Sequence, residues 1–234
     1  MSSLCDILHI SKGITSLIGS GGKSTLLAKL AYELSVHSKV IVAATTKMLP
    51  MSDTPIYTGN DMKKLTEIMK ETDLLTVGTY ASQGKLGAPA IDVTVLKNAA
   101  CYIILECDGS RTLPLKAHRI FEPVVPESST QTIMLLGLSG IGKRISETVH
   151  CPALYAKLTG CSESDTVTPE IAAKALVEEY RSDARLHYDK VILNQIQSEK
   201  DLSSAIKIAG IINNELPVSV FCGNIREGEL QCLY

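Results

Sequence analysis

The sequence predicts an α/β protein with a mostly parallel sheet flanked by helices. Short apolar runs alternate along the chain with stretches whose apolar residues recur at helical spacing. Several strand-like runs are apolar throughout, as is typical of parallel strands covered on both faces. Strands separated by helices form βαβ units, and ligands of such sheets bind at the carboxyl ends of the strands.

The elements follow one another in a regular order. Strands are predicted over residues 14–18, 39–45, 74–77, 101–106, 132–136, 190–193 and 218–221. Helices are predicted after Gly22 and over residues 61–71, 89–98 and 201–214. A further helix begins after Thr168, because a threonine cap, a proline at the first helical position and Glu170 in the first turn are typical of a helix start.

The length of 234 residues fits one domain, so we expect residues 1–234 to form a single domain. The most irregular stretch is 109–130, which contains Pro114, Pro123 and Pro126. We expect this stretch to be an excursion from the sheet with a functional role.

The composition excludes several classes of partner. The net charge is −2 and only 4% of the residues are aromatic, with no Trp, so nucleic-acid binding by a basic surface or by base stacking is not expected. The chain begins without a recognisable signal peptide, and no window is apolar enough for a membrane span. The seven Cys include no C-x-x-C pair, so reduced thiols and a cytoplasmic location are expected.

The strongest motif is a glycine-rich stretch between a predicted strand and a predicted helix: Gly19, Ser20, Gly21, Gly22, Lys23, Ser24 and Thr25. Backbone N–H groups of such a loop surround phosphate oxygens at a helix N-terminus. Lys23 would neutralise phosphate charge and Ser24 would ligate Mg²⁺. This motif predicts a P-loop NTPase-like fold that binds ATP or GTP with Mg²⁺.

Leu17 stands where the longer phosphate-loop pattern has Gly, so the loop is the short form similar to that of Mur-type amide ligases. The alternative is a glycine-rich turn with a chance Lys-Ser pair.

Acidic residues lie at the end of the strand over 101–106. Asp108 or Glu106 is predicted to hold Mg²⁺, and the other to orient an attacking nucleophile. Arg111 and Lys116 lie just beyond and are candidates to bind phosphate or an anionic substrate. The alternatives are an exposed acidic turn and, for Lys116, a solvated surface position.

Two other strand ends carry polar residues. Thr45, Thr46 and Lys47 are candidate contacts for the γ-phosphate or for a second substrate, with a plain polar strand exit as the alternative. Asn194 is a candidate nucleotide contact, since GTPases carry Asn-Lys-x-Asp at such a strand end. Here Gln197 occupies the Asp position, so guanine specificity does not follow.

A second stretch, 137–144, has the full phosphate-loop spacing but ends in Arg144, which lacks the hydroxyl needed for Mg²⁺. No amphipathic period follows it. We interpret it as a strand-exit loop and not as a second nucleotide site. His118 and His150 have no ligand partner at a recognisable spacing, so ordinary hydrogen-bonded histidines are expected.

Six segments resemble, in the same order, one known family, the selenium-dependent molybdenum hydroxylase accessory proteins. The segments are 18–23, 44–48, 106–111, 113–117, 122–126 and 137–143. Cys107 departs from this family, which usually has Ala there. The resemblance implies a P-loop protein involved in the maturation of molybdenum hydroxylases, with such an enzyme or its cofactor as partner.

The sequence leaves three functions open. In the first, an NTPase with Lys23, Glu106 and Arg111 as catalytic groups drives a maturation step on a selenium- or molybdenum-containing cofactor. The second is a small-molecule kinase or Mur-like ligase, and the third is a nucleotide-gated binding module without turnover. A homodimer is expected where a phosphate loop borrows a residue from a neighbouring copy.

Overall fold

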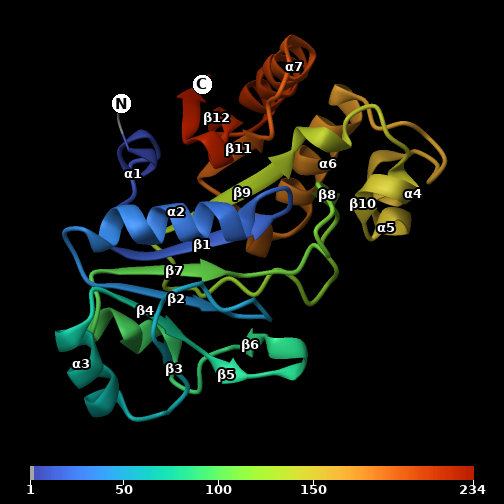
Figure 1. The fold of residues 1–234 in the computed structure, drawn as a ribbon. Coiled ribbons are helices and arrows are strands. Elements are labelled where there is room, and N and C mark those ends of the chain that lie inside the picture. The colour runs from blue at the N-terminus through green and yellow to red at the C-terminus, as the bar shows by residue number, and fades with distance from the viewer. Residues whose placement is uncertain (1–2) are drawn as a thin grey trace. The chain divides into compact units, whose positions relative to one another are not determined.

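The predicted α/β class is confirmed by a computed structural model, which describes residues 3–234 and contains a mostly parallel sheet of nine strands flanked by helices (Figure 1). The chain divides into two compact units, and each is described by itself. The described part of the first unit comprises residues 3–17, 24–108 and 124–131. The second comprises residues 18–23, 109–123 and 132–234. The expectation of a single domain stays a prediction.

The first unit contains five strands of the sheet, all parallel to their neighbours. Their order is β1 (Gly13–Gly19, of which 13–17 lie in this unit), β7 (Tyr102–Glu106), β2 (Val40–Ala44), β4 (Leu74–Val77) and β3 (Ile56–Tyr57). All five residues of β2 are buried, as its continuously apolar sequence predicts.

The register of these strands brings several polar residues to one edge. Leu17 of β1 pairs with Glu106 of β7, and Glu106 pairs on its other side with Ala44 of β2. The strands therefore end at the same level. Thr45 and Cys107, which follow β2 and β7, begin the carboxyl edge of this unit.

Helices α2 (Lys23–Ser35) and α3 (Met62–Glu71) confirm two predicted helices. The Asp61 side chain caps α3 by accepting from the N–H groups of Lys63 and Lys64. The predicted helix over 89–98 was wrong. Only a 3₁₀-helix, η2 (Val93–Asn98), forms there, since its β-branched residues at 93–95 disfavour a longer α-helix.

Smaller elements complete the first unit. The four-residue helix α1 (Leu4–Ile7) precedes β1. A short hairpin of β5 (Thr79–Tyr80) and β6 (Leu86–Gly87), with η1 (Ser82–Gly84) at its tip, lies against the chain after β2. Met48 and Leu86 exchange two backbone hydrogen bonds of 2.9 and 2.8 Å, which fix this hairpin.

The second unit contains four strands in the order β13 (Glu229–Cys232), β12 (Ser219–Asn224), β11 (Lys190–Asn194) and β9 (Gln131–Gly137, of which 132–137 lie in this unit). Strands β9, β11 and β12 are parallel, and β13 pairs antiparallel with β12. Asn194 ends β11 and pairs with Gly137 on one side and Gly223 on the other. This register places the Asn194 side chain at the carboxyl edge of the second unit.

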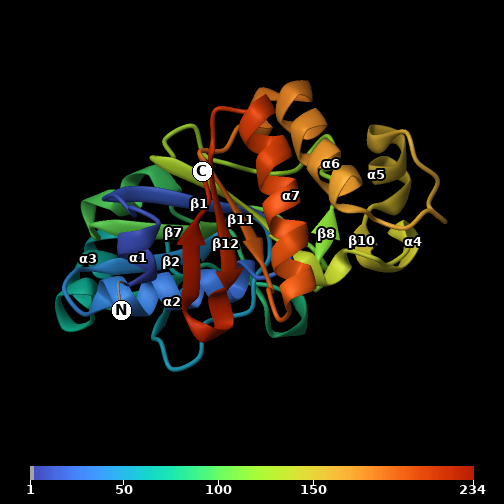
Figure 2. The same cartoon turned by 90° about the horizontal axis from the view of Figure 1, so that it is seen from above.

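Helices α6 (Pro169–Ser182) and α7 (Glu199–Glu215) run side by side in this unit (Figure 2). Helix α6 begins as predicted, with the Thr168 hydroxyl accepting from Ile171 N–H. Helix α7 begins before the predicted residue 201 because Ser198 is its cap. The remaining elements are η3 (Leu138–Gly140), α4 (Ile145–Thr148), α5 (Pro152–Thr159), η4 (Ala184–Leu186), η5 (Ile225–Glu227) and the parallel pair β8 (Leu115–Lys116) and β10 (Val149–His150).

Across residues 3–234, no helix is both long enough and apolar enough to cross a bilayer.

Candidate functional site

The glycine-rich loop connects β1 to α2, as predicted, and none of its three glycines can be replaced without a clash. Gly21 and Gly22 have φ angles of +84° and +141°, which L-residues rarely adopt. A Cβ on Gly21 would lie 2.4 Å from the Cα of Gly137, and one on Gly22 would lie 2.3 Å from the Nδ2 of Asn194. The loop therefore packs directly on the carboxyl ends of β9 and β11.

Asn194 anchors the loop from within the same unit. Its Nδ2 donates to the carbonyl of Gly21 at 2.7 Å, and its Oδ1 accepts from the N–H of Ile225 at 2.9 Å. The side chain is buried, so losing either contact would leave a polar group without a partner away from water. The anchoring role of Asn194 is observed, while its contact with a nucleotide stays a prediction.

Lys23 folds back over the loop that precedes it. Its ammonium group donates to the carbonyl of Gly19 at 2.5 Å, and the residue is only 3% exposed. Ser20 is also held, because its N–H donates to the carbonyl of Leu135 at 2.9 Å. The loop is thus fixed by backbone and side-chain contacts in the second unit, with the charge of Lys23 beside it.

In the first unit, the Ser24 hydroxyl donates to the Oε2 of Glu106 at 3.0 Å. Glu106 is 8% exposed and lies at the carboxyl end of β7. A serine hydroxyl and a carboxylate oxygen are the types of ligand that hold Mg²⁺ beside a phosphate loop. Thr25, the last residue of the motif, is half-buried in α2.

The residues after β2 lie close to Glu106. The N–H of Thr45 donates to the carbonyl of Glu106 at 3.0 Å. The Thr46 hydroxyl is buried and has no hydrogen-bond partner among the residues that the structure describes, which is costly for a buried polar atom. Lys47 is exposed. A metal-bound water or a phosphate oxygen at this edge would satisfy the Thr46 hydroxyl, so the residues of this edge fit Mg²⁺ with a phosphate.

Cys107 and Asp108, which follow β7, are both fully buried. Burial raises the pKa of the Cys107 thiol to about 11, so this thiol is protonated at neutral pH and is a poor metal ligand. Asp108 remains a candidate for holding Mg²⁺ with Glu106. Within residues 3–234, no group of three or more His, Cys, Asp or Glu side chains is arranged to hold a metal ion.

Beyond Asp108, the chain enters the second unit. Lys116 is buried there and donates to the carbonyl of Gly109 at 2.8 Å, with Glu122 Oε2 at 3.1 Å. Arg111 is exposed and has a left-handed backbone conformation. Lys116 is therefore engaged with the protein itself, and Arg111 faces solvent.

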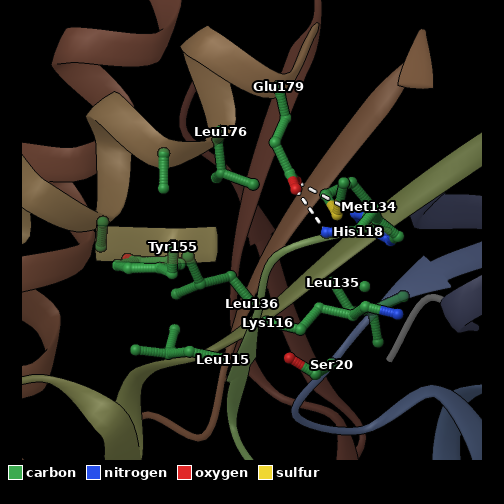
Figure 3. Close-up of a pocket in the computed structure, with 13 residues that line it drawn as sticks. Ser20, Leu115, Lys116, His118, Met134, Leu135, Leu136, Tyr155, Leu176 and Glu179 are labelled. Carbon is green, nitrogen blue, oxygen red and sulfur yellow. Dashed lines mark hydrogen bonds and ion pairs between the residues drawn. The ribbon is translucent and has the colours of Figure 1, made fainter. Parts of the chain in front are cut away.

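One buried hydrogen-bonded pair of this unit was not predicted. Glu179 of α6 accepts from the backbone N–H of His118 at 2.6 Å, and its Oε2 lies 3.0 Å from His118 Nδ1 (Figure 3). His118 is thus hydrogen-bonded, as expected. The sequence signal for Glu179 is its place on the apolar stripe of α6 formed by Ala172, Ala175 and Leu176.

A small cavity lies beside His118 and Glu179. It has a volume of about 10 Å³ and is also lined by Gly19 and Ser20 of the glycine-rich loop. Such a volume accommodates about one water molecule. The cavity is therefore too small for a nucleotide or for any other substrate.

The second glycine-rich stretch, 137–144, is a strand exit as predicted. After β9 the chain forms η3, and the four-residue helix α4 begins at Ile145. Gly137 lies against Gly21, so the start of this stretch supports the first loop. Lys143 is exposed, in contrast to Lys23.

Together, the fold and the site define an α/β protein with a glycine-rich strand-to-helix loop. The YqeC protein family matches residues 15–153, which is more than half of the chain, and the chain belongs to this family. It is similar to the "Uncharacterized protein YqeC" of Escherichia coli (strain K12), with 33% identity over 162 residues. That alignment covers 66% of this chain and 63% of the relative, less than two thirds of the relative's length. No solved structure matches the chain.

Proposed function

We propose that this protein binds ATP or GTP with Mg²⁺ through Gly19–Ser24 and uses the nucleotide in the maturation of a selenium- or molybdenum-dependent hydroxylase. The observation that carries the nucleotide part is the hydrogen bond from Ser24 to Glu106, since it joins the end of the glycine-rich motif to an acid at a strand end. The client part rests on the resemblance of the six sequence segments.

Each residue has a defined role in this proposal. The N–H groups of the loop and the Lys23 ammonium bind the phosphates. Ser24 and Glu106, with Asp108, would hold Mg²⁺, which when bound neutralises charge on the phosphates. Thr46 offers its buried hydroxyl to the same region. Arg111 is assigned to the transferring phosphoryl group or to its acceptor.

The test is calorimetric titration with ATP and GTP, with and without Mg²⁺. Replacing Lys23→Ala removes the charge-assisted contacts to phosphate, and we expect affinity to fall about 100-fold, the equivalent of the loss of one such hydrogen bond. Lys143→Ala is the matched control, because it changes the exposed lysine of the second glycine-rich stretch. Nucleotide affinity that is equal in both variants and the wild type would refute the assignment of the loop.

The second candidate is a small-molecule kinase or a Mur-like ligase that activates a carboxylate by phosphorylation. It is favoured by the short, Mur-like form of the glycine-rich loop and by the exposed Arg111, a cation suited to an anionic acceptor. Nucleotide turnover that begins only when a small acid or alcohol is added would support it. Turnover stimulated only by a hydroxylase would support the first proposal, and tight binding without turnover would identify a nucleotide-gated module.

A further inference from the structure

The segment 109–123 of the second unit makes two tight turns that are joined by a single buried ammonium group. In the first turn Leu113 N–H donates to Ser110 carbonyl at 3.0 Å. In the second, Glu122 N–H donates to Arg119 carbonyl at 2.8 Å. Lys116, whose side chain is 2% exposed, binds the Gly109 carbonyl and the Glu122 carboxylate. Lys116 therefore fixes one turn relative to the other.

Each turn presents an exposed arginine. Arg111 and Thr112 have φ angles of +48° and +63°, an unfavourable conformation for any residue with a side chain and especially for a β-branched one. Backbone strain of this kind is concentrated at functional sites. In the second turn, the Arg119 guanidinium carbon lies 5.9 Å from the centroid of the Phe121 ring, a contact that orients the side chain.

The two arginines have no acidic partner among residues 3–234. This contrasts with Lys116, whose charge is balanced by Glu122 at 3.1 Å. A guanidinium group offers a planar set of donors that matches a carboxylate or a phosphate. The segment thus presents two exposed groups of this kind on two turns that Lys116 joins.

The pKa of a buried histidine, His150, depends on the charges of this region. His150 of β10 pairs with Lys116 of β8, and its carbonyl accepts from Ala117 N–H at 3.0 Å. Burial is the main cause that lowers the pKa of His150, and the positive charges of Lys116, Arg119 and Arg111 lower it further. The Glu122 carboxylate acts in the opposite direction. The cations outnumber the anion around His150, so a bound anion would raise its pKa.

We propose that Arg111 and Arg119 bind the carboxylate or phosphate group of the second substrate in the nucleotide reaction. Lys116 positions the two turns and does not contact this substrate. The inference deepens the proposed function, because it names the chemical class of the second substrate. It also adds Arg119 to a site for which the sequence indicated only Arg111 and Lys116.

The test uses the His150 imidazole as a reporter in NMR titrations of the full chain with inorganic phosphate and, separately, with acetate, at constant ionic strength. His150→Asn identifies the resonance. We expect a saturable shift of the His150 signal and a rise of its pKa. A response to phosphate alone assigns a phosphate group to the substrate, and a response to acetate assigns a carboxylate.

The double variant Arg111→Gln/Arg119→Gln should weaken the response at least about tenfold, which corresponds to the lower end of the free energy of one charge-assisted contact. Lys143→Gln, an exposed lysine of the same unit, is the control and should respond like the wild type. The shift of the His150 signal should persist in Lys23→Ala, since anion binding at Arg111 and Arg119, and not at the glycine-rich loop, causes it.

Two results would overturn the inference: a double variant that responds like the wild type, or a response that disappears in Lys23→Ala. Failure of the proposed function looks different. A protein with an arginine-dependent His150 response but no nucleotide binding would keep the anion site and lose its assignment to a nucleotide reaction. Equal urea midpoints for the wild type and the double variant verify that both are folded.

Discussion

The two glycine-rich stretches of this protein have similar sequences and different structures. In the first, residues 19–24, the loop leads into the thirteen-residue helix α2, and Lys23 is buried against the Gly19 carbonyl. In the second, residues 137–144, the strand passes into a 3₁₀ turn and a four-residue helix, and Lys143 is exposed. Similar spacing of glycine and lysine is therefore compatible with two different local structures, a loop that leads into a long helix and a strand exit that does not.

The largest effect expected from this comparison is on stability. Gly21 and Gly142 have nearly the same φ, +84° and +82°, but a Cβ on Gly21 would strike Gly137 while one on Gly142 would meet nothing within 4 Å. Gly142→Ala should therefore cost only about 1 kcal/mol, for the backbone conformation. Gly21→Ala should cost about 3 kcal/mol, because the clash is added.

Urea denaturation of both glycine variants measures this difference in the free energy of unfolding. Because the two φ angles match, Gly142→Ala is the control for the cost of placing an alanine in this backbone conformation. Equal losses of stability would contradict the close packing of the first loop on β9.

The next effect concerns the side chains that hold the two stretches. Asn194 binds the Gly21 carbonyl, and its neighbour Gln195 accepts from the Ser139 hydroxyl of the second stretch at 2.6 Å. We expect Asn194→Ala to cost about 2 kcal/mol, because it leaves the buried Gly21 carbonyl and Ile225 N–H without their partner. Gln195→Ala acts on an exposed contact and should cost less than about 0.5 kcal/mol.

The Asn194 and Gln195 variants are compared by thermal unfolding and by nucleotide titration. Asn194→Ala should also weaken nucleotide binding, since the loop loses its anchor, whereas Gln195→Ala should not. A larger loss of stability in Gln195→Ala would show that the second stretch is the more important one for the fold.

The smallest effect concerns the hydroxyl of Ser24, which the first glycine-rich stretch has and the second lacks, because Arg144 stands at that position. Ser24→Ala should reduce the enhancement of nucleotide binding by Mg²⁺ about tenfold, as expected for one lost metal contact. The reciprocal change, Arg144→Ser in a Lys23→Ala protein, gives the second stretch the missing hydroxyl and should restore no binding. Titrations with and without Mg²⁺ measure both. Binding restored by Arg144→Ser would make the second stretch a nucleotide site.

Local signals in the sequence predicted those parts of the fold that depend on neighbours along the chain. The start of α6 follows from Thr168 and Pro169, and the buried strand β2 follows from its apolar run. Strand β13 was not predicted, because its short run alternates in polarity and its antiparallel pairing with β12 is a tertiary property. The helix expected from Pro89 was wrong because local β-branched residues opposed it.

In the candidate site, too, local features were predictable and long-range contacts were not. The sequence predicted the glycine-rich loop and the acids at the end of β7, since these lie at recognisable strand ends. The contact between Asn194 and Gly21 joins residues 173 positions apart, and the one between His118 and Glu179 joins residues 61 apart. Such contacts depend on which strands and helices become neighbours, and no local pattern encodes that.

The direct contact of Gly21 with Gly137 has a consequence for the divergence of related sequences. A side chain at either position would occupy the space of the other residue's backbone, so neither position can change while the other keeps its place. We expect substitutions at positions 21 and 137 to appear together during evolution, with a shift of the intervening backbone. Covariation between these two small residues, which lie 116 positions apart in the sequence, would thus be evidence of a packing constraint that neither motif reveals alone.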